Sequence, residues 1–232
     1  MDYQQHSKVK NVIHQREWVE HEILFASLGV LENRVLDVGA GLSPYKSHLV
    51  MNGFHYVSHD FNSYVPDSKA NPGLQDASWI YPKHDYNCDI LEIPAEKEFS
   101  LVLCTEVLEH VPDPVAALRK MSELCQVNGY IIITCPFLSL MHQAPYWFSS
   151  GLSPYWIKHW SREFNLEVIK VEVCGDYVDL MIQEIVRLLT CRFPIRGIFR
   201  LVSILHLFRP LIPKQIKDSG GFGTLAVLRK VS

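Results

Sequence analysis

An acidic residue and two glycines stand at the end of a short apolar run near the start of the chain. The run covers residues 34–38, contains Asp37, and leads directly into Gly39, Ala40 and Gly41. A short apolar run bounded by turn residues is typical of a buried parallel strand. Two glycines allow a tight turn and a close approach of the backbone to a ligand. Because nucleotide-like ligands bind at the carboxyl ends of such strands, the segment predicts a ligand contact.

Two further aspartates follow at distances that suit a nucleoside. Asp60 ends a second apolar run, 23 positions after Asp37, and a carboxylate there can accept hydrogen bonds from both hydroxyls of a ribose. Asp89 precedes a later apolar run, where it could contact the exocyclic amine of an adenine while Ile90 covers the ring. The alternatives are an exposed turn aspartate at position 60 and a helix-capping aspartate at position 89.

These side chains can meet only if strands and helices bring them to one edge of a sheet. Hydrophobic spacing predicts strands over residues 34–38, 54–58, 99–104, 130–134, 166–173 and 223–228. It predicts helices over residues 11–29, 44–50 with Pro44 in the first position, and 114–124 ended by Asn128 and Gly129. Residues 62–88 read as a long irregular insertion. The alternation of strands and helices indicates an α/β protein with a parallel sheet.

The composition excludes several classes of protein. The chain has 232 residues, of which 48% are hydrophobic and 20% charged, so neither a disordered nor a fibrous protein is indicated. A net charge of -3 gives no electrostatic footprint for nucleic acid, and no nucleic-acid partner is expected. Scattered cysteines, a polar start without a signal peptide and the lack of an uncharged membrane-spanning stretch predict a cytoplasmic protein. No set of metal ligands stands out, since His55 and His59 lack a carboxylate partner close in sequence.

A third candidate segment, residues 105–114, follows the predicted strand at 99–104. Residues 35–41, Asp60, residues 88–89, this segment and residues 127–134 occur in that order along the chain. Together they resemble the consecutive motifs of class I S-adenosylmethionine-dependent methyltransferases, including the methyltransferase type 11-like group. The resemblance covers roughly residues 30–136.

The resemblance implies a fold and a cofactor. The implied fold is a doubly wound, Rossmann-like sheet of seven strands with an N-terminal helix, a C-terminal helical insertion and an antiparallel last strand. The implied cofactor is S-adenosylmethionine, whose methionine part, ribose, adenine and sulfonium would meet successive motifs. The residues that the resemblance assigns to the cofactor, in chain order, are Asp37, Gly39, Ala40, Gly41, Asp60, Phe61, Asp89, Ile90, Thr105 and Glu106.

The sequence departs from common family patterns after the two glycines. Leu42, Ser43, Pro44 and Tyr45 follow there, and this form resembles a subgroup of bacterial methyltransferases linked to surface-polysaccharide and natural-product pathways. Pro44 occupies the position of the third glycine of a dinucleotide-binding turn, and no Tyr-x-x-x-Lys pair is present. Both observations argue against a NAD(P)-dependent oxidoreductase. A non-catalytic S-adenosylmethionine-binding partner subunit is the other rival prediction.

Residues that would face a methyl acceptor are predicted from their place after the strands. The resemblance directs His110 toward the cofactor or substrate, and His142 follows the last parallel strand as a candidate base or substrate ligand; a structural role is the alternative for both. An aromatic acceptor pocket, or else a small core beneath a long loop, is predicted from Tyr146, Trp147, Tyr155 and Trp156. The predicted reaction is O-methylation of a saccharide or natural product. The alternatives are C- or N-methylation of a lipid-like or quinone-like acceptor.

The stretch 185–217 is basic and apolar and contains no acidic residue. It predicts either a lid or homodimer contact, or a peripheral contact at the inner face of a membrane. The domain prediction is therefore an N-terminal helical segment at 1–30, a cofactor-binding domain at 31–180 and 219–232, and a helical cap at 181–218.

Overall fold

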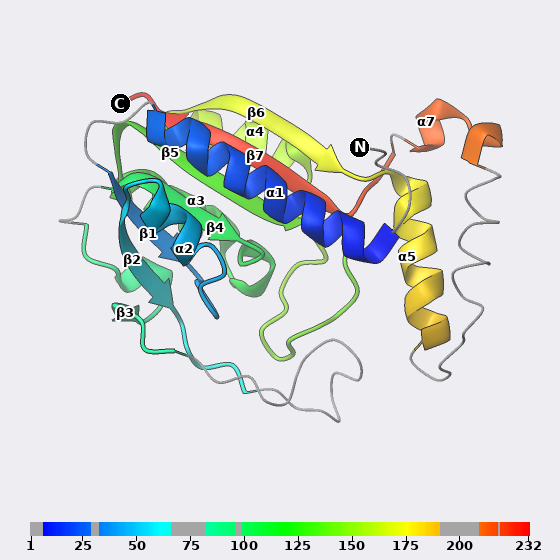
Figure 1. Ribbon diagram of the computed structural model, residues 1–232, viewed down its shortest axis with the longest axis horizontal. Helices are drawn as coiled ribbons and strands as arrows, with labels where there is room; N and C mark the ends of the chain where they lie inside the picture. Colours follow the sequence, from blue (N-terminus) through cyan, green and yellow to red (C-terminus); the bar gives the residue numbers. More distant parts are fainter. Residues whose placement is uncertain (1–6, 29–32, 66–81, 96–98, 191–208, 218) are drawn as a thin grey trace.

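The computed structural model describes residues 7–28, 33–65, 82–95, 99–190, 209–217 and 219–232. They form one seven-stranded sheet with the order β3-β2-β1-β4-β5-β7-β6 (Figure 1). The strands are β1 Arg34–Val38, β2 His55–Asp60, β3 Tyr86–Asn87, β4 Phe99–Thr105, β5 Cys125–Pro136, β6 Leu166–Cys174 and β7 Gly223–Lys230. Strands β1 to β5 pair in parallel, whereas β7 runs antiparallel to both β5 and β6. The predicted Rossmann-like sheet and its antiparallel last strand are confirmed.

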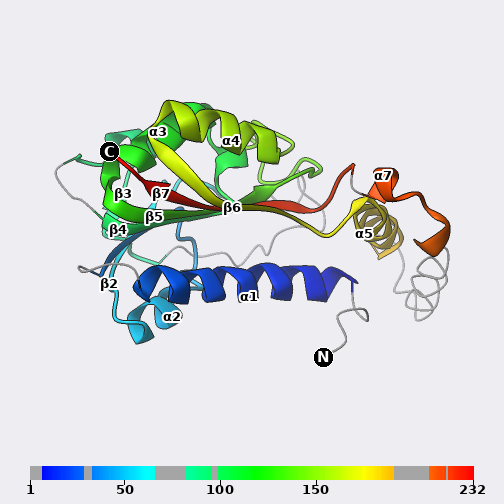
Figure 2. The same cartoon turned by 90° about the horizontal axis from the view of Figure 1, so that it is seen from above.

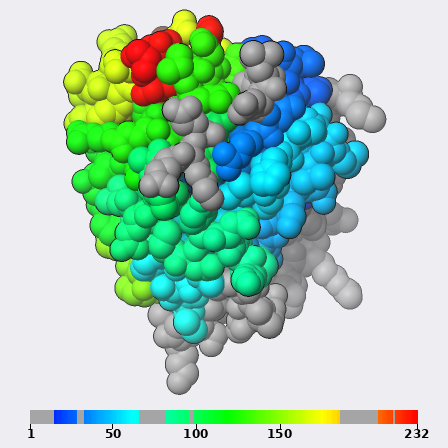
Figure 3. Space-filling model, turned by 90° about the vertical axis from the view of Figure 1, so that its left-hand side faces the viewer, coloured from blue at the N-terminus to red at the C-terminus, as the bar shows by residue number. Residues whose placement is uncertain are grey.

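Helices cover both faces of the sheet (Figure 2). One face carries α1 and α2, the other carries α3 and α4, and α5 and α7 lie beyond one end of the sheet. The helices are α1 Ser7–Leu28, α2 Lys46–Met51, α3 Pro114–Leu124, α4 Pro154–Glu163, α5 Tyr177–Thr190 and α7 Lys214–Lys217, with short 3-10 turns η1 Ile90–Glu92, η2 Leu108–His110 and η3 Arg209–Leu211. Figure 3 views the end of the molecule where the C-terminal residues, in red, lie among yellow and green segments.

The larger core lies between the sheet and helices α3 and α4. Helix α3 begins where the Asp113 carboxylate accepts hydrogen bonds from the backbone N–H groups of Val115 and Ala116, at 3.1 and 2.9 Å. The apolar residues of α3 recur at helical spacing, so Leu118 and Met121 are both fully buried against the sheet. This packing fixes the segment between β4 and α3, which carries residues 105–113.

The second core lies under α1. Trp18, Val19 and Ile23 bury against β1, β4 and the strands beside them. The Lys170 ammonium on β6 lies 2.9 Å from the buried carboxylate of Glu22, which ties the helix to the far strands of the sheet. Helix α1 is therefore part of the cover of the sheet, and its N-terminal half extends toward the carboxyl ends of the parallel strands.

Two predicted element boundaries are wrong. Helix α3 ends at Leu124 and not at the Asn128–Gly129 pair, which lies inside β5. Asn128 adopts a φ of 67°, and the pairing of β4 with β5 shifts register across this point, because the pair forms an irregularity in the strand and not a helix end. Pro44 does not begin a helix either. The Ser43 N–H donates to the Ala40 carbonyl at 2.7 Å, so the glycine turn continues and α2 starts only at Lys46.

The later part of the chain is anchored by an ion cluster. The Arg209 guanidinium lies 2.6 Å from the Asp179 carboxylate and also contacts Asp176, which joins η3 to the start of α5. Residues 191–208 and 218 of the predicted cap lie outside the described residues, as do residues 66–81 of the predicted insertion. The cap, its dimer or membrane contact and the domain limits stay predictions. None of the helices that the structure describes is both long and apolar enough to cross a bilayer.

Candidate active site

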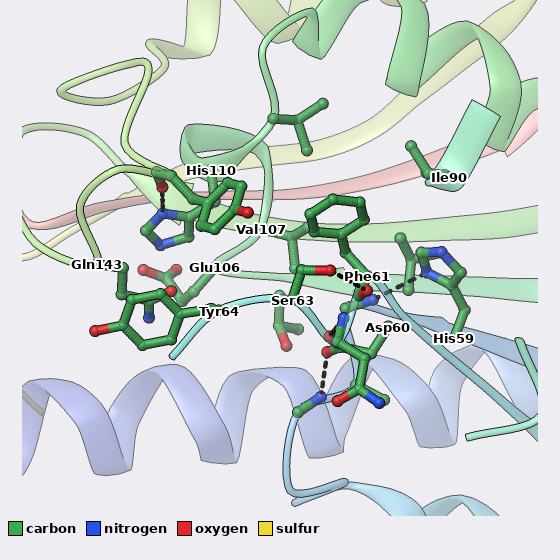
Figure 4. Close-up of a pocket in the computed structure, with 18 of the residues that line it drawn as sticks. His59, Asp60, Phe61, Ser63, Tyr64, Ile90, Glu106, Val107, His110 and Gln143 are labelled. Carbon is green, nitrogen blue, oxygen red and sulfur yellow. Dashed lines mark hydrogen bonds between the residues drawn. The ribbon is translucent and has the colours of Figure 1, made fainter. Parts of the chain in front are cut away.

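A cavity of about 510 Å³ opens at the carboxyl ends of the parallel strands. The turn after β1, the end of β2, the start of η1 and the segment after β4 form its walls. In an open α/β sheet, ligands bind at this place because strand order reverses there and loops leave a crevice. In Figure 4, Asp60 and His59 lie at one side of the cavity, while His110, Glu106 and Gln143 lie at the other.

The turn after β1 is shaped for a close ligand contact. Gly39 has a φ of 64°, and a Cβ at this position would lie 2.3 Å from Val107 Cγ2. The Gly41 N–H donates to Asp60 Oδ2 at 3.0 Å, and the Asn62 N–H donates to Asp60 Oδ1 at 2.8 Å (Figure 4). Two backbone donors thus orient the Asp60 carboxylate beside the turn, where lone pairs on both oxygens remain able to accept further hydrogen bonds.

His59 joins two walls of the cavity, a role that was not predicted from the sequence. Its Nε2 lies 2.9 Å from the Cys88 carbonyl, and its Nδ1 lies 3.5 Å from the Gly39 N–H. A carbonyl only accepts, so Nε2 carries the proton and Nδ1 accepts from Gly39. Burial lowers the pKa of His59 and keeps the ring neutral, as this arrangement requires. The imidazole holds the glycine turn against the segment that leads to Asp89.

Nine of the ten residues assigned to the cofactor line the cavity, namely Gly39, Ala40, Gly41, Asp60, Phe61, Asp89, Ile90, Thr105 and Glu106. Asp37 does not line it. Its carboxylate is 1% exposed and accepts a hydrogen bond from the Tyr56 hydroxyl at 2.7 Å. Burial is the main reason that the pKa of the Asp37 carboxyl is raised to about 7, and the nearby Asp60 charge adds to it. Asp37 therefore supports the turn from behind.

Asp89 has the capping role that the sequence left open, and its contact with an adenine stays a prediction. Its carboxylate accepts from the Leu91 N–H at 2.9 Å and caps η1, while the Glu92 side chain accepts from the Asp89 N–H at 3.3 Å. Asp89 also lines the cavity beside Ile90. The cap fixes the carboxylate at the edge of the cavity.

Glu106 lies at the other side of the cavity with a backbone φ of 55°. Its Oε1 accepts from Thr134 Oγ1 at 3.0 Å and from Gln15 Nε2 at 2.5 Å. Glu106 is exposed to the open cavity, but the protein around it still desolvates the carboxyl and raises its pKa, and both hydrogen bonds oppose that rise. Gln15 comes from α1, so the first helix contributes to the site. The sequence carried no signal for this contact, because 91 positions separate the two residues.

His110 stands next to Glu106 on the cavity wall. Its Nδ1 lies 2.5 Å from the Tyr146 carbonyl and therefore carries the proton, which leaves a lone pair on Nε2. Burial, and less strongly the neighbouring His142, lowers the pKa of His110 to about 4. The imidazole is therefore neutral at pH 7 and presents an unprotonated nitrogen.

The predicted aromatic wall forms only in part. Tyr146 lines the cavity and packs edge-to-face on Phe61, with ring centroids 5.6 Å apart. Trp147, Tyr155 and Trp156 do not line it. Helix α4 turns away from the cavity, so Trp156 packs on the larger core and Tyr155 is 81% exposed. The structure thus gives no support to these three as acceptor contacts. The loop also places Phe148 on the wall, which the sequence did not predict.

His142 lies behind the wall and not in it. Its ring packs edge-to-face on His110 with centroids 4.8 Å apart, and its Nδ1 lies 2.9 Å from the Leu140 carbonyl. The sequence placed both histidines at the acceptor end, and the structure brings them into contact. It also brings Glu109 to them, a residue that sequence reasoning passed over.

Comparison with known proteins identifies the family. Residues 12–171 match the methyltransferase domain family. The chain belongs to this family. The resemblance to class I S-adenosylmethionine-dependent methyltransferases is thereby confirmed, and the family membership decides against a NAD(P)-dependent oxidoreductase.

Individual relatives of this methyltransferase-family chain are distant. It is 30% identical over 115 residues to a ubiquinone biosynthesis O-methyltransferase of Yersinia enterocolitica, a match that covers 48% of the chain and only 46% of that relative. Its fold is similar to a SAM dependent methyltransferase from Archaeoglobus fulgidus, with a TM-score of 0.56, 17% identity and coverage of 93% and 94% of the two chains. It is also similar to the [4+2]-cyclase SpnF, with a TM-score of 0.55, 13% identity and coverage of 93% and 81%.

Proposed function

We propose that this protein transfers a methyl group from S-adenosylmethionine to a hydroxyl oxygen of an apolar, aromatic small molecule. A single observation carries the proposal. One cavity joins a glycine turn with an oriented carboxylate, Gly39 to Gly41 and Asp60, to a wall that presents the neutral imidazole of His110.

The cofactor end fits a nucleoside with a charged amino acid attached. Gly39 leaves no room for a side chain, Asp60 retains acceptor capacity for ribose hydroxyls, and Glu106 supplies negative charge toward a cation. S-adenosylmethionine supplies a methyl group that its sulfonium already activates. The protein then needs only to align the acceptor oxygen, exclude water and accept the hydroxyl proton.

The acceptor end is apolar and aromatic. Tyr64, Tyr146, Phe148, Val111 and the exposed ring of Phe61 line it or its rim. These side chains suit a planar ring better than the many hydroxyls of a sugar, and this favours the natural-product form of the sequence prediction over the saccharide form. The similarity to ubiquinone biosynthesis O-methyltransferases points the same way.

Oxygen is favoured over nitrogen or carbon because of the protonation state of His110. A neutral imidazole with its free nitrogen at the wall can accept the proton that a hydroxyl must lose. With a pKa of about 4, however, it is a weak base, so an acidic hydroxyl such as a phenol suits it better than an alcohol. The similarity to a named cyclase shows why turnover must be measured, since one fold hosts several reactions.

Incubation with S-adenosylmethionine and separate phenolic, sugar and amine acceptors tests the proposal, with methylated product and S-adenosylhomocysteine measured by mass spectrometry. We expect methylation of phenols, and a loss of about 100-fold or more in kcat for His110→Gln with cofactor affinity retained. His55→Gln, which changes an exposed histidine on β2, is the matched control and should turn over like the wild type. Methylation of sugars or amines alone would reject the acceptor class. Cofactor binding without any turnover would favour the non-catalytic partner.

A further inference from the structure

Three side chains with metal-ligating atoms converge at and behind the proposed acceptor wall, where His110 lines the cavity. Glu109 and His110 come from η2, and His142 comes from the loop between β5 and α4. One ligand atom of each residue lies within 4.8 Å of the other two. His110 Nε2 and Glu109 Oε1 are 3.5 Å apart. His142 is distant in sequence from the adjacent pair Glu109 and His110, and it meets them because the loop folds back onto η2.

Backbone carbonyls fix the tautomer of both histidines. His110 Nδ1 lies 2.5 Å from the Tyr146 carbonyl, and His142 Nδ1 lies 2.9 Å from the Leu140 carbonyl. Since a carbonyl can only accept, each Nδ1 carries a proton, and Nε2 is the nitrogen of each ring that can bind a metal ion. Metal-ligating histidines have this arrangement, in which a partner of one nitrogen orients the other toward the ion.

The third residue is a buried carboxyl with an unused oxygen. Glu109 is 1% exposed, and its Oε2 has no hydrogen-bond partner among the described residues. Burial and the nearby Glu106 charge raise the pKa of the Glu109 carboxyl well above its usual range. A buried carboxylate oxygen without a partner is costly, and a bound cation would satisfy it. The cluster therefore gathers acceptor atoms around a place where a positive charge is missing.

We propose that Glu109, His110 and His142 bind a divalent transition-metal ion of the Zn²⁺ class. Two imidazole nitrogens and one carboxylate oxygen suit Zn²⁺, whereas Mg²⁺ prefers oxygen ligands alone. Ligand atoms around a tetrahedral Zn²⁺ lie roughly 3.4 Å from one another, so the Glu109–His110 pair already has a suitable separation and the His142 ring closes in by about an ångström.

Backbone hydrogen bonds hold the loop between β5 and α4, which carries His142, next to Glu109. The backbone N–H groups of Phe148 and Ser149 donate to the Glu109 carbonyl at 2.9 and 3.2 Å, so the segment that carries His142 is attached to the residue that would share the metal. Three protein ligands leave one coordination position of Zn²⁺ open beside the cavity wall. With the ion bound, His110 Nε2 is a ligand and no longer the base. The ion would take over that role by lowering the pKa of an acceptor hydroxyl, a role that rests on the proposed function, whereas the site itself does not.

Titration of untagged, full-length protein with Zn²⁺ alone, in competition with a chromogenic chelator and without S-adenosylmethionine, tests the site. We expect one tight Zn²⁺ per chain, no displacement by Mg²⁺, and a loss of affinity of about tenfold or more in His142→Asn and Glu109→Gln. Binding of Co²⁺ should give visible absorption bands of a four- or five-coordinate ion that both variants lose. His55→Asn, the matched control on an exposed histidine, should bind as the wild type does.

His142 is only partly buried and lies in a loop, so His142→Asn should fold. This variant therefore tests the site even where Glu109→Gln does not fold. Circular dichroism establishes that each variant is folded. Absence of stoichiometric Zn²⁺ binding, or wild-type affinity in His142→Asn, would overturn the proposal. Tight binding that leaves methyl transfer unchanged would keep the metal site and reject only its role toward the acceptor.

Discussion

The two ends of the cavity are built in different ways. At the cofactor end, the backbone N–H groups of Gly41 and Asn62 orient the Asp60 carboxylate, and all three residues adjoin strands of the sheet. At the proposed acceptor end, a loop returns across the molecule and is held on η2 through the Glu109 carbonyl and the His110 ring. The first end is formed by the sheet itself, and the second by contacts between segments far apart in sequence.

Because the two ends are built separately, cofactor binding and acceptor chemistry should respond to different substitutions. Changes at the strand ends should alter cofactor affinity and leave the loop cluster intact, whereas changes in the loop cluster should alter acceptor chemistry with the cofactor still bound.

The largest effect is expected from Gly39→Ala. The added Cβ would lie 2.3 Å from Val107 Cγ2 in a backbone conformation that disfavours side chains, so we expect the free energy of unfolding to fall by about 3 kcal/mol, with cofactor binding lost. Urea denaturation and calorimetry measure the two quantities. Gly53→Ala is the control: its φ is 83°, but the nearest atom is 3.4 Å from the new Cβ. It should lose only about 1–2 kcal/mol of stability and keep its cofactor affinity. Equal loss of cofactor affinity in both variants would contradict the assignment of the turn.

Asp60→Asn should lower the affinity for S-adenosylhomocysteine by about 10- to 100-fold, because a charged hydrogen-bond acceptor becomes a neutral one. Asp85→Asn is matched to it, since Asp85 also accepts two hydrogen bonds at β2, from the N–H and the hydroxyl of Ser58, but does not line the cavity. Asp85→Asn should destabilise the fold and leave the affinity unchanged. Unchanged affinity in Asp60→Asn would remove this residue from the site.

The free energy of unfolding should fall as the pH rises, because the buried Asp37 carboxyl ionises. Its folded-state pKa of about 7 lies above the ordinary value of 3.8, so this group favours folding fully below pH 3.8 and loses that contribution as pH rises through 7. Between pH 5.5 and 8 the loss is about 2 kcal/mol. Urea denaturation at both pH values should show this fall in the wild type relative to Asp37→Asn, which cannot ionise. Parallel pH profiles for the two proteins would contradict it.

The smallest effect concerns the aromatic residues of the loop. Tyr146→Ala should raise the KM for a phenolic acceptor about fivefold, because the ring is on the wall while its carbonyl still holds His110. Tyr155→Ala removes an 81% exposed ring and should leave the KM unchanged. A larger change in KM for Tyr155→Ala than for Tyr146→Ala would indicate that the acceptor binds nearer to α4.

More residues of the cofactor end than of the proposed acceptor end could be predicted from the sequence. The glycine turn, Asp60 and Asp89 follow from local patterns, since each lies at a strand end whose position the hydrophobic spacing predicts. Sequence reasoning misjudged Pro44 and Asn128, because turn geometry and strand pairing override local propensity there. It missed Gln15, His59 and Glu109, because their contacts depend on packing between distant segments. The loop after β5 has no periodicity, so its aromatic residues could not be sorted into wall and core.

Calorimetric titration of S-adenosylhomocysteine into the wild type, Asp60→Asn and His142→Asn tests the separation of the two ends most directly. We predict one binding site per chain in the wild type, a loss of affinity of about tenfold or more in Asp60→Asn, and an affinity within about twofold of the wild type in His142→Asn. No binding by the wild type, or an equal loss in the two variants, would contradict it.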